Sequence, residues 1–177
     1  MSLINKVALV TGAGNGIGSG IAMRLARDGA DVALVDLDEP AMQAVAQEIA
    51  ALGRKAVVFK ADVGDREQVY AAIDHAESIL GGFDIMVNNA GVALVQPIAD
   101  TTPEEVARIQ RINVEGTLWG IQAAASKFIA RQHKGKIINA SSIAGHNGFP
   151  MLGMYCATKF AVRALTQAAA QEYASAG

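Results

Sequence analysis

Several residue types on which particular classes of protein depend are scarce in this sequence. Among its 177 residues there is one cysteine, Cys156, which excludes an internal disulfide and most metal sites built from cysteine. The three histidines are too far apart in the sequence for a ligand cluster, so we expect no metal site. The formal net charge of −2 provides no basic surface, so we expect neither nucleic acid nor a membrane as a partner.

Long apolar runs are missing as well. No stretch is long and apolar enough to span a bilayer, and the first apolar run, Val7–Val10, is too short for a signal peptide. The single cysteine fits a reducing compartment, so we expect a cytoplasmic protein. The length fits one domain that occupies residues 1–177.

Short apolar runs and longer helical segments alternate along the chain. The runs are rich in β-branched residues and lie at residues 7–10, 31–35, 56–59, 85–87 and 136–140. Apolar residues at helical spacing fill the segments between them, including a long helix over 103–132 and a last helix near 153–174. Because runs without polar alternation are typical of strands covered on both faces, the sequence predicts an α/β fold. We expect a doubly wound parallel sheet of Rossmann type, with five strands and flanking helices.

Local patterns also predict how several helices begin. The segment Thr102–Glu105 (TPEE) predicts a capping box with proline at the first helical position, and Asp65–Gln68 (DREQ) follows the same pattern. We expect the first helix to bury a face that includes Ile17, Ile21 and Ala26.

A glycine-rich turn follows the first strand and precedes this helix. In Thr11–Gly18 (TGAGNGIG), glycines let backbone N–H groups approach a pyrophosphate at the helix N-terminus. A side chain at Gly12 or Gly16 would hold the phosphates away, and Gly18 lets the helix lie close to the strand. The strand–turn–helix context predicts a dinucleotide site; the alternative is a tight turn without a ligand.

Polar side chains end the next three strands. Asp36 ends the second strand, where a carboxylate accepts hydrogen bonds from both ribose hydroxyls and repels a 2′-phosphate, so it favours NAD over NADP. Asp62 ends the third strand and Asn88–Gly91 (NNAG) the fourth, so both are expected at the same cleft edge. The alternatives are that Asp36 only caps its strand and that the others are ordinary turn residues.

The last helix carries Tyr155 and Lys159 four residues apart, and therefore on one helical face. An ammonium group beside a phenol favours the phenolate, which lets a tyrosine exchange a proton with a carbonyl or alcohol oxygen. Ser142 follows the fifth strand at the same cleft edge, where its hydroxyl is placed to bond a substrate oxygen. The alternatives are a surface Tyr–Lys pair and a turn serine.

Asn113 lies within the long predicted helix. Asparagine is a poor helix former, and in mid-helix it opens the backbone ladder locally and holds water. The alternative is a buried amide whose hydrogen bonds are satisfied within the protein.

Together these motifs resemble the classical short-chain dehydrogenase/reductase family from Lys6 onwards. The shared motifs are TGxxxGxG, NNAG and YxxxK, with Ser142 standing 13 positions before Tyr155. The resemblance implies hydride transfer between NAD and a small alcohol or ketone. It also implies that Tyr155 is the general acid/base, Ser142 orients the substrate oxygen, Lys159 binds the nicotinamide ribose and Asn113 holds a relay water.

The resemblance further implies which residues bind the cofactor. These are Gly12, Asn15, Gly16, Ile17, Gly18, Asp36, Leu37, Asp62, Val63, Asn89, Gly91, Tyr155 and Lys159. It also implies a homo-oligomer, usually a tetramer.

Within the family, three segments look most like diacetyl/acetoin reductases, also called 2,3-butanediol dehydrogenases. They are Trp119–Ala124, Lys136–Ala140 and Lys159–Gln167. A polyol and a 3-oxoacyl thioester are alternative substrates. Because family members continue with two further strands and a lid, we expect a C-terminally incomplete chain whose fifth strand is an exposed apolar edge. A truncated, non-catalytic protein that binds NAD or pairs with a longer homologue is the alternative.

Overall fold

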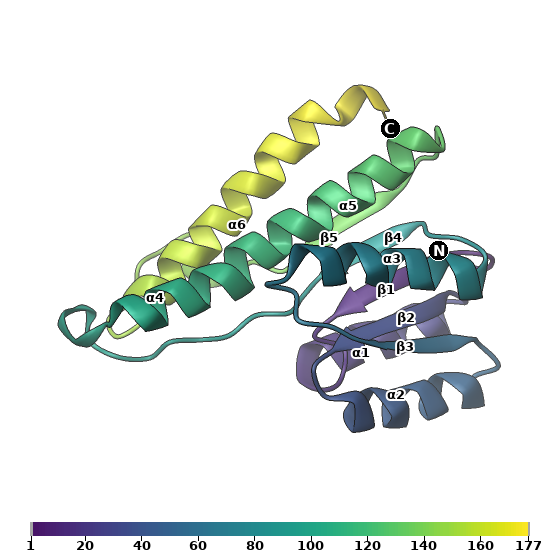
Figure 1. Ribbon diagram of the computed structural model, residues 1–177, viewed down its shortest axis with the longest axis horizontal. Helices are drawn as coiled ribbons and strands as arrows, with labels where there is room; N and C mark the ends of the chain where they lie inside the picture. Colours follow the sequence, from purple (N-terminus) through teal and green to yellow (C-terminus); the bar gives the residue numbers. More distant parts are fainter. Residues whose placement is uncertain (1, 177) are drawn as a thin grey trace.

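Five strands form one parallel sheet, as the apolar runs predicted. The computed structural model describes residues 2–176. Its strands are β1 (Val7–Thr11), β2 (Asp31–Asp36), β3 (Ala56–Lys60), β4 (Ile85–Asn88) and β5 (Lys136–Asn139). Their order in the sheet is β3-β2-β1-β4-β5, so the chain builds one half outward from β1 and then returns to build the other (Figure 1). The direction of winding reverses between β1 and β4, and a reversal of this kind places a crevice at the carboxyl ends of these strands.

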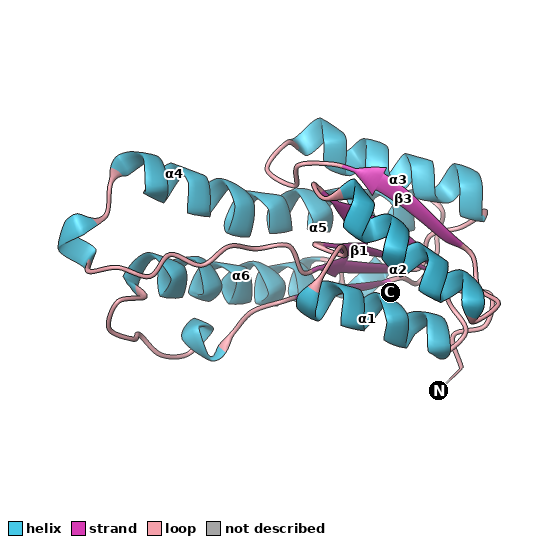
Figure 2. Ribbon diagram, turned by 90° about the horizontal axis from the view of Figure 1, so that it is seen from below, coloured by secondary structure: helices cyan, strands magenta, loops and turns pink. Residues whose placement is uncertain are grey.

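Helices cover both faces of the sheet, which confirms the doubly wound fold. They are α1 (Gly16–Arg27), α2 (Glu39–Ala51), α3 (Arg66–Leu80), α4 (Pro103–Gln110), α5 (Gly116–Ala130) and α6 (Gly153–Glu172). Figure 2 shows α1 and α6 on one side of the sheet and α3 and α5 on the other. Ala22, Met42 and Ile49 of α1 and α2 pack into one apolar core, and Ile73 and Phe128 of α3 and α5 into the second.

The long helix expected over 103–132 is interrupted in its middle by a π-turn. α4 passes directly into Arg111–Glu115, whose residues are π-helical, and these pass directly into α5. Asn113 lies at the centre of this turn, so the expectation that it opens the helical ladder is confirmed. Single π-turns of this kind are frequent at functional sites because they displace one residue from the regular helical surface.

The expected capping box at Thr102 is confirmed, whereas the second expected capping box at Asp65 and the expected burial of Ile17 need correction. The capping box is confirmed, since the Thr102 hydroxyl accepts from Glu105 N and the Glu105 carboxylate accepts from Thr102 N. Asp65 caps α3, but Gln68 does not return a bond to its backbone; the Gln68 amide oxygen accepts from Asp62 N instead. Ile17 was wrongly expected inside, because it is 76% exposed at the first turn of α1, over the crevice.

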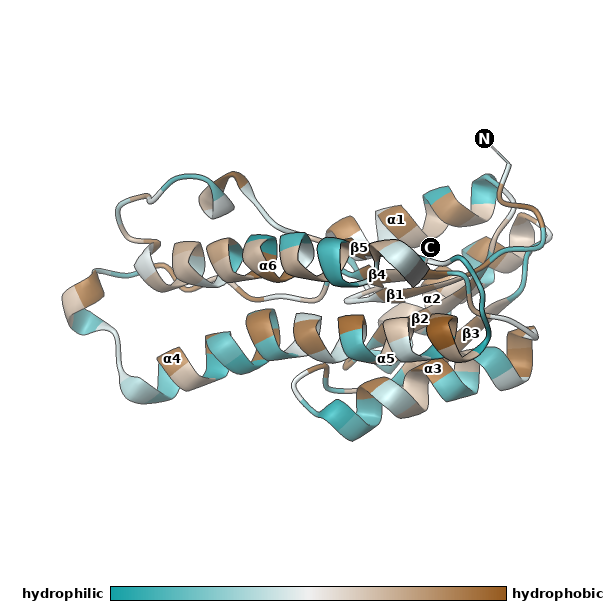
Figure 3. Ribbon diagram, turned by 90° about the horizontal axis from the view of Figure 1, so that it is seen from above, coloured by the Kyte–Doolittle hydropathy of each residue, from teal (hydrophilic) through white to brown (hydrophobic). Residues whose placement is uncertain are grey.

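The outer edge of β5 is exposed, as the sequence predicted. Among the described residues, β5 pairs only with β4, and its Ile138 is 52% exposed. Between β5, α5 and α6 lies a cavity of about 280 Å³, lined by apolar residues that include Phe128, Ile137 and Ala169. α6 mixes apolar and polar bands along its length (Figure 3). Within residues 2–176, no helix is both long and apolar enough to cross a membrane.

Candidate active site

A groove of about 420 Å³ lies at the carboxyl ends of the central strands, where the strand order places a crevice. It is lined by Gly12, Asn15, Ile17, Gly18, Asp36, Leu37, Ala61, Asp62, Val63, Asn89, Ala90, Gly91, Val92, Arg108 and Ile112. All sequence-predicted cofactor residues are among these except Gly16, Tyr155 and Lys159.

The floor of the groove is the glycine-rich turn between β1 and α1. Gly12 and Gly16 have positive φ angles of 65° and 56°, which glycine adopts without strain. A Cβ on Gly18 would collide with the carbonyl oxygen of Gly12, so α1 lies against the turn more closely than any side chain would allow. The N-terminus of α1 therefore points its free N–H groups at the groove, which suits an anion such as a pyrophosphate.

Asp36 at the end of β2 closes one end of the groove. Its Oδ2 accepts a 2.9 Å hydrogen bond from Gly14 N, and its Oδ1 accepts from Leu37 N at 2.7 Å. Asp38 N also donates to Oδ1, at 3.2 Å. The carboxylate thus fastens the glycine turn to the end of β2, while its Oδ2 keeps one lone pair for a ligand. Its negative charge lies where the sequence predicted that a ribose would bind.

The loop after β4 is fastened to β1 by Thr11 and Asn89. The Thr11 hydroxyl accepts from the backbone N–H groups of Asn89 and Ala90, both at 3.0 Å. Asn89 Nδ2 in turn donates to the Thr11 carbonyl oxygen at 2.9 Å. These bonds hold the NNAG segment beside the glycine turn, so that both motifs line the same groove.

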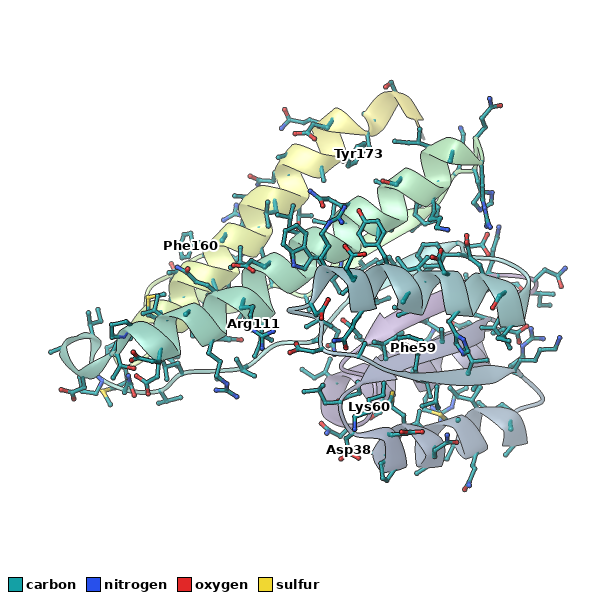
Figure 4. All side chains as sticks on the ribbon, viewed as in Figure 1. Asp38, Phe59, Lys60, Arg111, Phe160 and Tyr173 are labelled. Carbon is teal, nitrogen blue, oxygen red and sulfur yellow. The ribbon has the colours of Figure 1, made fainter. Side chains whose placement is uncertain are left out.

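Asp62 is held by an arginine that the sequence analysis missed. Arg111 extends from the junction of α4 and α5 toward the turn after β3, where its guanidinium bonds Asp62 Oδ2 at 2.8 Å (Figure 4). Arg108 and Ile112 also line the groove from this helix. No sequence motif marks these residues, because they reach the groove only through the way the helix packs across the sheet.

The reacting residues predicted from the sequence gather where β5 and α6 meet. Lys159 Nζ donates a 2.8 Å hydrogen bond to the carbonyl oxygen of Ala140, and it lies 5.7 Å from the centre of the Tyr155 ring. Lys159 is 6% exposed, and this burial lowers the pKa of its ammonium group below the usual range for lysine. The Tyr155 ring and the ammonium group are therefore neighbours, as the i, i+4 spacing predicted.

Ser142 lies in the segment that joins β5 to α6. A hydrogen bond holds this segment against α6, since Ser141 Oγ donates to the carbonyl oxygen of Lys159 at 3.0 Å. Ser142 Oγ accepts a 3.1 Å bond from Ala144 N. Its own hydroxyl proton has no acceptor within residues 2–176, so it remains free to donate to a ligand.

Asn113 is almost fully buried, and both hydrogens of its side-chain amide are bonded within the protein. Its Oδ1 accepts from Val92 N at 2.8 Å, and its Nδ2 donates to Val92 O at 2.9 Å and to Thr158 Oγ1 at 3.0 Å. Both amide hydrogens are used, so the side chain has no donor left for a water molecule. The two donors of the side chain are therefore satisfied within the protein, while the backbone forms the π-turn. The role of Asn113 in holding a relay water stays a prediction.

Gly91 connects the groove to the reacting residues. A Cβ at Gly91 would lie 3.2 Å from Asn113 Oδ1 and 3.5 Å from Lys159 Nζ, and Gly91 itself lines the groove. A dinucleotide that lies along the groove with its pyrophosphate at α1 would thus reach Lys159 and Tyr155 with its far end. This arrangement suits hydride transfer from a dinucleotide coupled to proton transfer from a phenol.

Comparisons with known proteins agree with this geometry. The profile of the family described as short chain dehydrogenase matches residues 6–177. An L-2,3-butanediol dehydrogenase from Corynebacterium glutamicum is 50% identical over 176 residues. A diacetyl reductase ((S)-acetoin forming) from Staphylococcus epidermidis is 47% identical over 174 residues. Each match covers 98% of this chain and 68% of the relative.

Solved structures of dehydrogenases are also similar to this chain over nearly its whole length. A short-chain type dehydrogenase/reductase from Mycobacterium marinum superposes with a TM-score of 0.95 at 41% identity, covering 99% of this chain and 72% of that one. An NAD⁺-bound xylitol dehydrogenase superposes with a TM-score of 0.95 at 33% identity, covering 100% of this chain and 68% of that one.

Proposed function

The chain belongs to the short-chain dehydrogenase family, and we propose that it transfers hydride between NAD and acetoin, diacetyl or 2,3-butanediol. Membership makes it an oxidoreductase of CH–OH donors that uses a nicotinamide cofactor. The observation that carries the proposal is the continuity from the glycine turn, past Gly91, to the Tyr155–Lys159 pair.

Asp36 supports NAD over NADP. Its carboxylate is fixed by the N–H groups of Gly14 and Leu37, so it cannot turn away from a ligand without losing both bonds. Asp38 and Glu39 follow at once and add negative charge at this end of the groove. A 2′-phosphate placed there would meet like charges, whereas ribose hydroxyls would find acceptors.

The proposed chemistry is a hydride transfer joined to a proton transfer. When bound, the nicotinamide supplies the hydride to the carbonyl carbon or accepts it from the carbinol carbon. In reduction, the Tyr155 hydroxyl gives its proton to the carbonyl oxygen, and the Lys159 ammonium group stabilises the phenolate that remains. The free hydroxyl proton of Ser142 bonds the same oxygen and holds it beside Tyr155, and in oxidation the proton returns to the phenolate.

The residues that follow Ser142 support a small apolar substrate. Ile143 is 70% exposed and Phe149 is 38% exposed, and both belong to the segment that leads from β5 to α6. The terminal methyl groups of diacetyl, acetoin or 2,3-butanediol would gain by covering these side chains, whereas the additional hydroxyls of a longer polyol would lose their water without finding partners. The names of the two curated relatives agree with the small-ketone choice.

We also propose a homo-oligomer. Phe160 is 44% exposed and projects from the outer side of α6 (Figure 4), and Met151, just before this helix, is exposed as well. Exposed apolar side chains of this size are typical of surfaces that contact another chain. Sedimentation of the purified chain at several concentrations measures its state.

Calorimetry and turnover with the purified 177-residue chain test the proposal. We expect NAD⁺ and NADH to bind more tightly than NADPH, and NADH to be oxidised with diacetyl and acetoin but not with a 3-oxoacyl thioester. Xylitol with NAD⁺ serves as the polyol comparison. Binding without turnover would support the non-catalytic alternative. Faster turnover of xylitol than of 2,3-butanediol would overturn the proposed choice of substrate.

A further inference from the structure

Two threonines on α6 bind asparagine side chains in the same manner. Thr158 Oγ1 accepts a 3.0 Å hydrogen bond from Asn113 Nδ2 and donates at 2.8 Å to the carbonyl oxygen of Tyr155. Two turns farther on, Thr166 Oγ1 accepts a 3.0 Å bond from Asn139 Nδ2 and donates at 2.7 Å to the carbonyl oxygen of Val162. The helix is therefore tied at two points, to the π-turn and to β5.

Only the first of these ties ends at the residue that exchanges the proton. Asn113 is itself fixed to Val92 by two bonds, so one chain of hydrogen bonds joins the loop after β4, the π-turn and the backbone of Tyr155. Thr158 is 1% exposed, and Asn113 likewise. Water does not compete for buried bonds of this kind, so they hold their members in one geometry.

We propose that Thr158 is a positioning residue for Tyr155. Its hydroxyl acts as acceptor toward Asn113 and as donor toward the Tyr155 carbonyl, and it thereby sets where the first turn of α6 places the phenol relative to Lys159. Valine has nearly the same shape but neither function, so it would leave one buried N–H of Asn113 without an acceptor. It would also remove the side-chain donor to the Tyr155 carbonyl, which would keep only its helical backbone bond. This inference rests on the proposed function, in which Tyr155 is the general acid/base.

The expected consequence is a change in catalysis with little change in cofactor binding. The groove lining does not include Thr158, so its loss leaves the dinucleotide contacts in place. Proton transfer, by contrast, depends on a separation that must be correct to a fraction of an ångström. Displacement of a reacting group by about 1 Å costs roughly 10²-fold in rate, so a partial release is expected to cost about tenfold.

Kinetics of three variants provide the first test. We expect Thr158→Val to lower kcat about tenfold with less than about a twofold change in KM for NADH, and Thr158→Ser to restore kcat to within about twofold. Thr166→Val is the matched control, because it removes the same pair of bonds at the other tie, and we expect it to leave kcat unchanged. An equal loss of kcat in Thr166→Val would show that the role is only structural and would overturn the proposal.

A second measurement does not depend on turnover. In protein labelled with ¹³C at the tyrosine carbon that bears the hydroxyl, the Tyr155 signal is assigned by its loss in Tyr155→Phe. We expect Thr158→Val to shift this signal, Thr158→Ser to restore it and Thr166→Val to leave it in place. An unshifted signal in folded Thr158→Val would overturn the positioning role even if the wild-type chain turns over. If the wild-type chain has no turnover, the proposed function fails, and the signal still decides this inference.

Discussion

The ammonium group of Lys159 lies 5.7 Å from the centre of the Tyr155 ring and donates a 2.8 Å hydrogen bond to the carbonyl oxygen of Ala140. Because Ala140 directly follows β5, this one side chain links the end of the sheet to the face of α6 that carries the phenol. The ammonium group is buried, so its field at the ring is screened less than that of an exposed lysine.

Tyr155→Phe removes the phenolic hydroxyl and keeps the ring. We expect kcat for diacetyl reduction to fall about 10²–10⁴-fold, the usual contribution of a positioned general acid. NADH affinity should change little, because phenylalanine keeps the ring and only one hydroxyl group is lost. Steady-state kinetics and calorimetry on the same preparation measure both quantities. Turnover that survives the substitution would show that another group gives the proton.

Asp36→Ala removes the carboxylate that we assign to cofactor choice. We expect weaker NADH binding and a gain in NADPH binding, because the ribose loses its acceptor and a 2′-phosphate loses a repelling charge. The loop bonds to Gly14 and Leu37 disappear too, so part of the NADH loss reflects a looser turn.

Glu39→Gln is the control for this change, since it removes a nearby charge at the start of α2 that makes no bond to the glycine turn within residues 2–176. Calorimetric titration of each variant with both cofactors gives the ratio of affinities. If the ratio of NADPH to NADH affinity were unchanged in Asp36→Ala, Asp36 would not determine the preference for NAD.

The sheet and its crevice followed from the sequence because they depend on local patterns. Uninterrupted apolar runs predicted buried parallel strands, and the turn at Gly12–Gly18 predicted where the first strand meets its helix. The residues of these turns line one groove because parallel strands bring their carboxyl ends to one edge.

The remaining features depend on how distant segments pack and left no signal in the sequence. Arg111 reaches Asp62 across 49 positions of sequence, and Thr158 reaches Asn113 across 45. A poor helix former at Asn113 predicted a disturbance, but not that both amide hydrogens would be used within the protein. The tie through Thr158 was missed for the same reason, since a threonine inside a helix is ordinary in composition and gains its role only from its partner.

Gly18→Ala tests the close approach of α1 to the glycine turn. The added methyl group would collide with the Gly12 carbonyl oxygen, and the neighbouring backbone has to move. We expect the free energy of unfolding to fall by about 1–3 kcal/mol and NADH binding to weaken, as for other overpacked sites. Urea unfolding and calorimetry measure these effects.

Gly20→Ala is the matched control in the same helix. A Cβ there would meet no atom within 4 Å, and alanine favours helix more than glycine does. We therefore expect a gain of about 0.5–1 kcal/mol and unchanged NADH binding. A similar loss of stability in both variants would contradict the collision that we infer at Gly18.

Asp84→Asn tests a charged cluster at the opposite end of the sheet from the groove. Asp84 precedes β4 and accepts from Lys6 Nζ at 2.8 Å and Val7 N at 2.9 Å, and its Oδ1 lies 2.9 Å from His133 Nε2. Burial, the largest single influence, raises the pKa of the Asp84 carboxyl, but the bonds from Lys6, Val7 and His133 outweigh it and hold the pKa below its usual range.

A carboxylate with a depressed pKa stabilises the fold above the pKa of the unfolded chain, about 3.9, and loses that effect as the pH falls through the folded value. We therefore expect Asp84→Asn to lower the free energy of unfolding by on the order of 1–2 kcal/mol at pH 7. The difference from the wild-type chain should begin to shrink at about pH 4, where the carboxylate of the unfolded chain takes up a proton, and it should vanish below the lower pKa of the folded carboxyl. Urea unfolding at pH 7, 5 and 3.5 measures the trend, with the exposed Asp100→Asn as the control. A difference that stays constant down to pH 3.5 would mean that the shape of the side chain at position 84, and not its charge, stabilises the cluster.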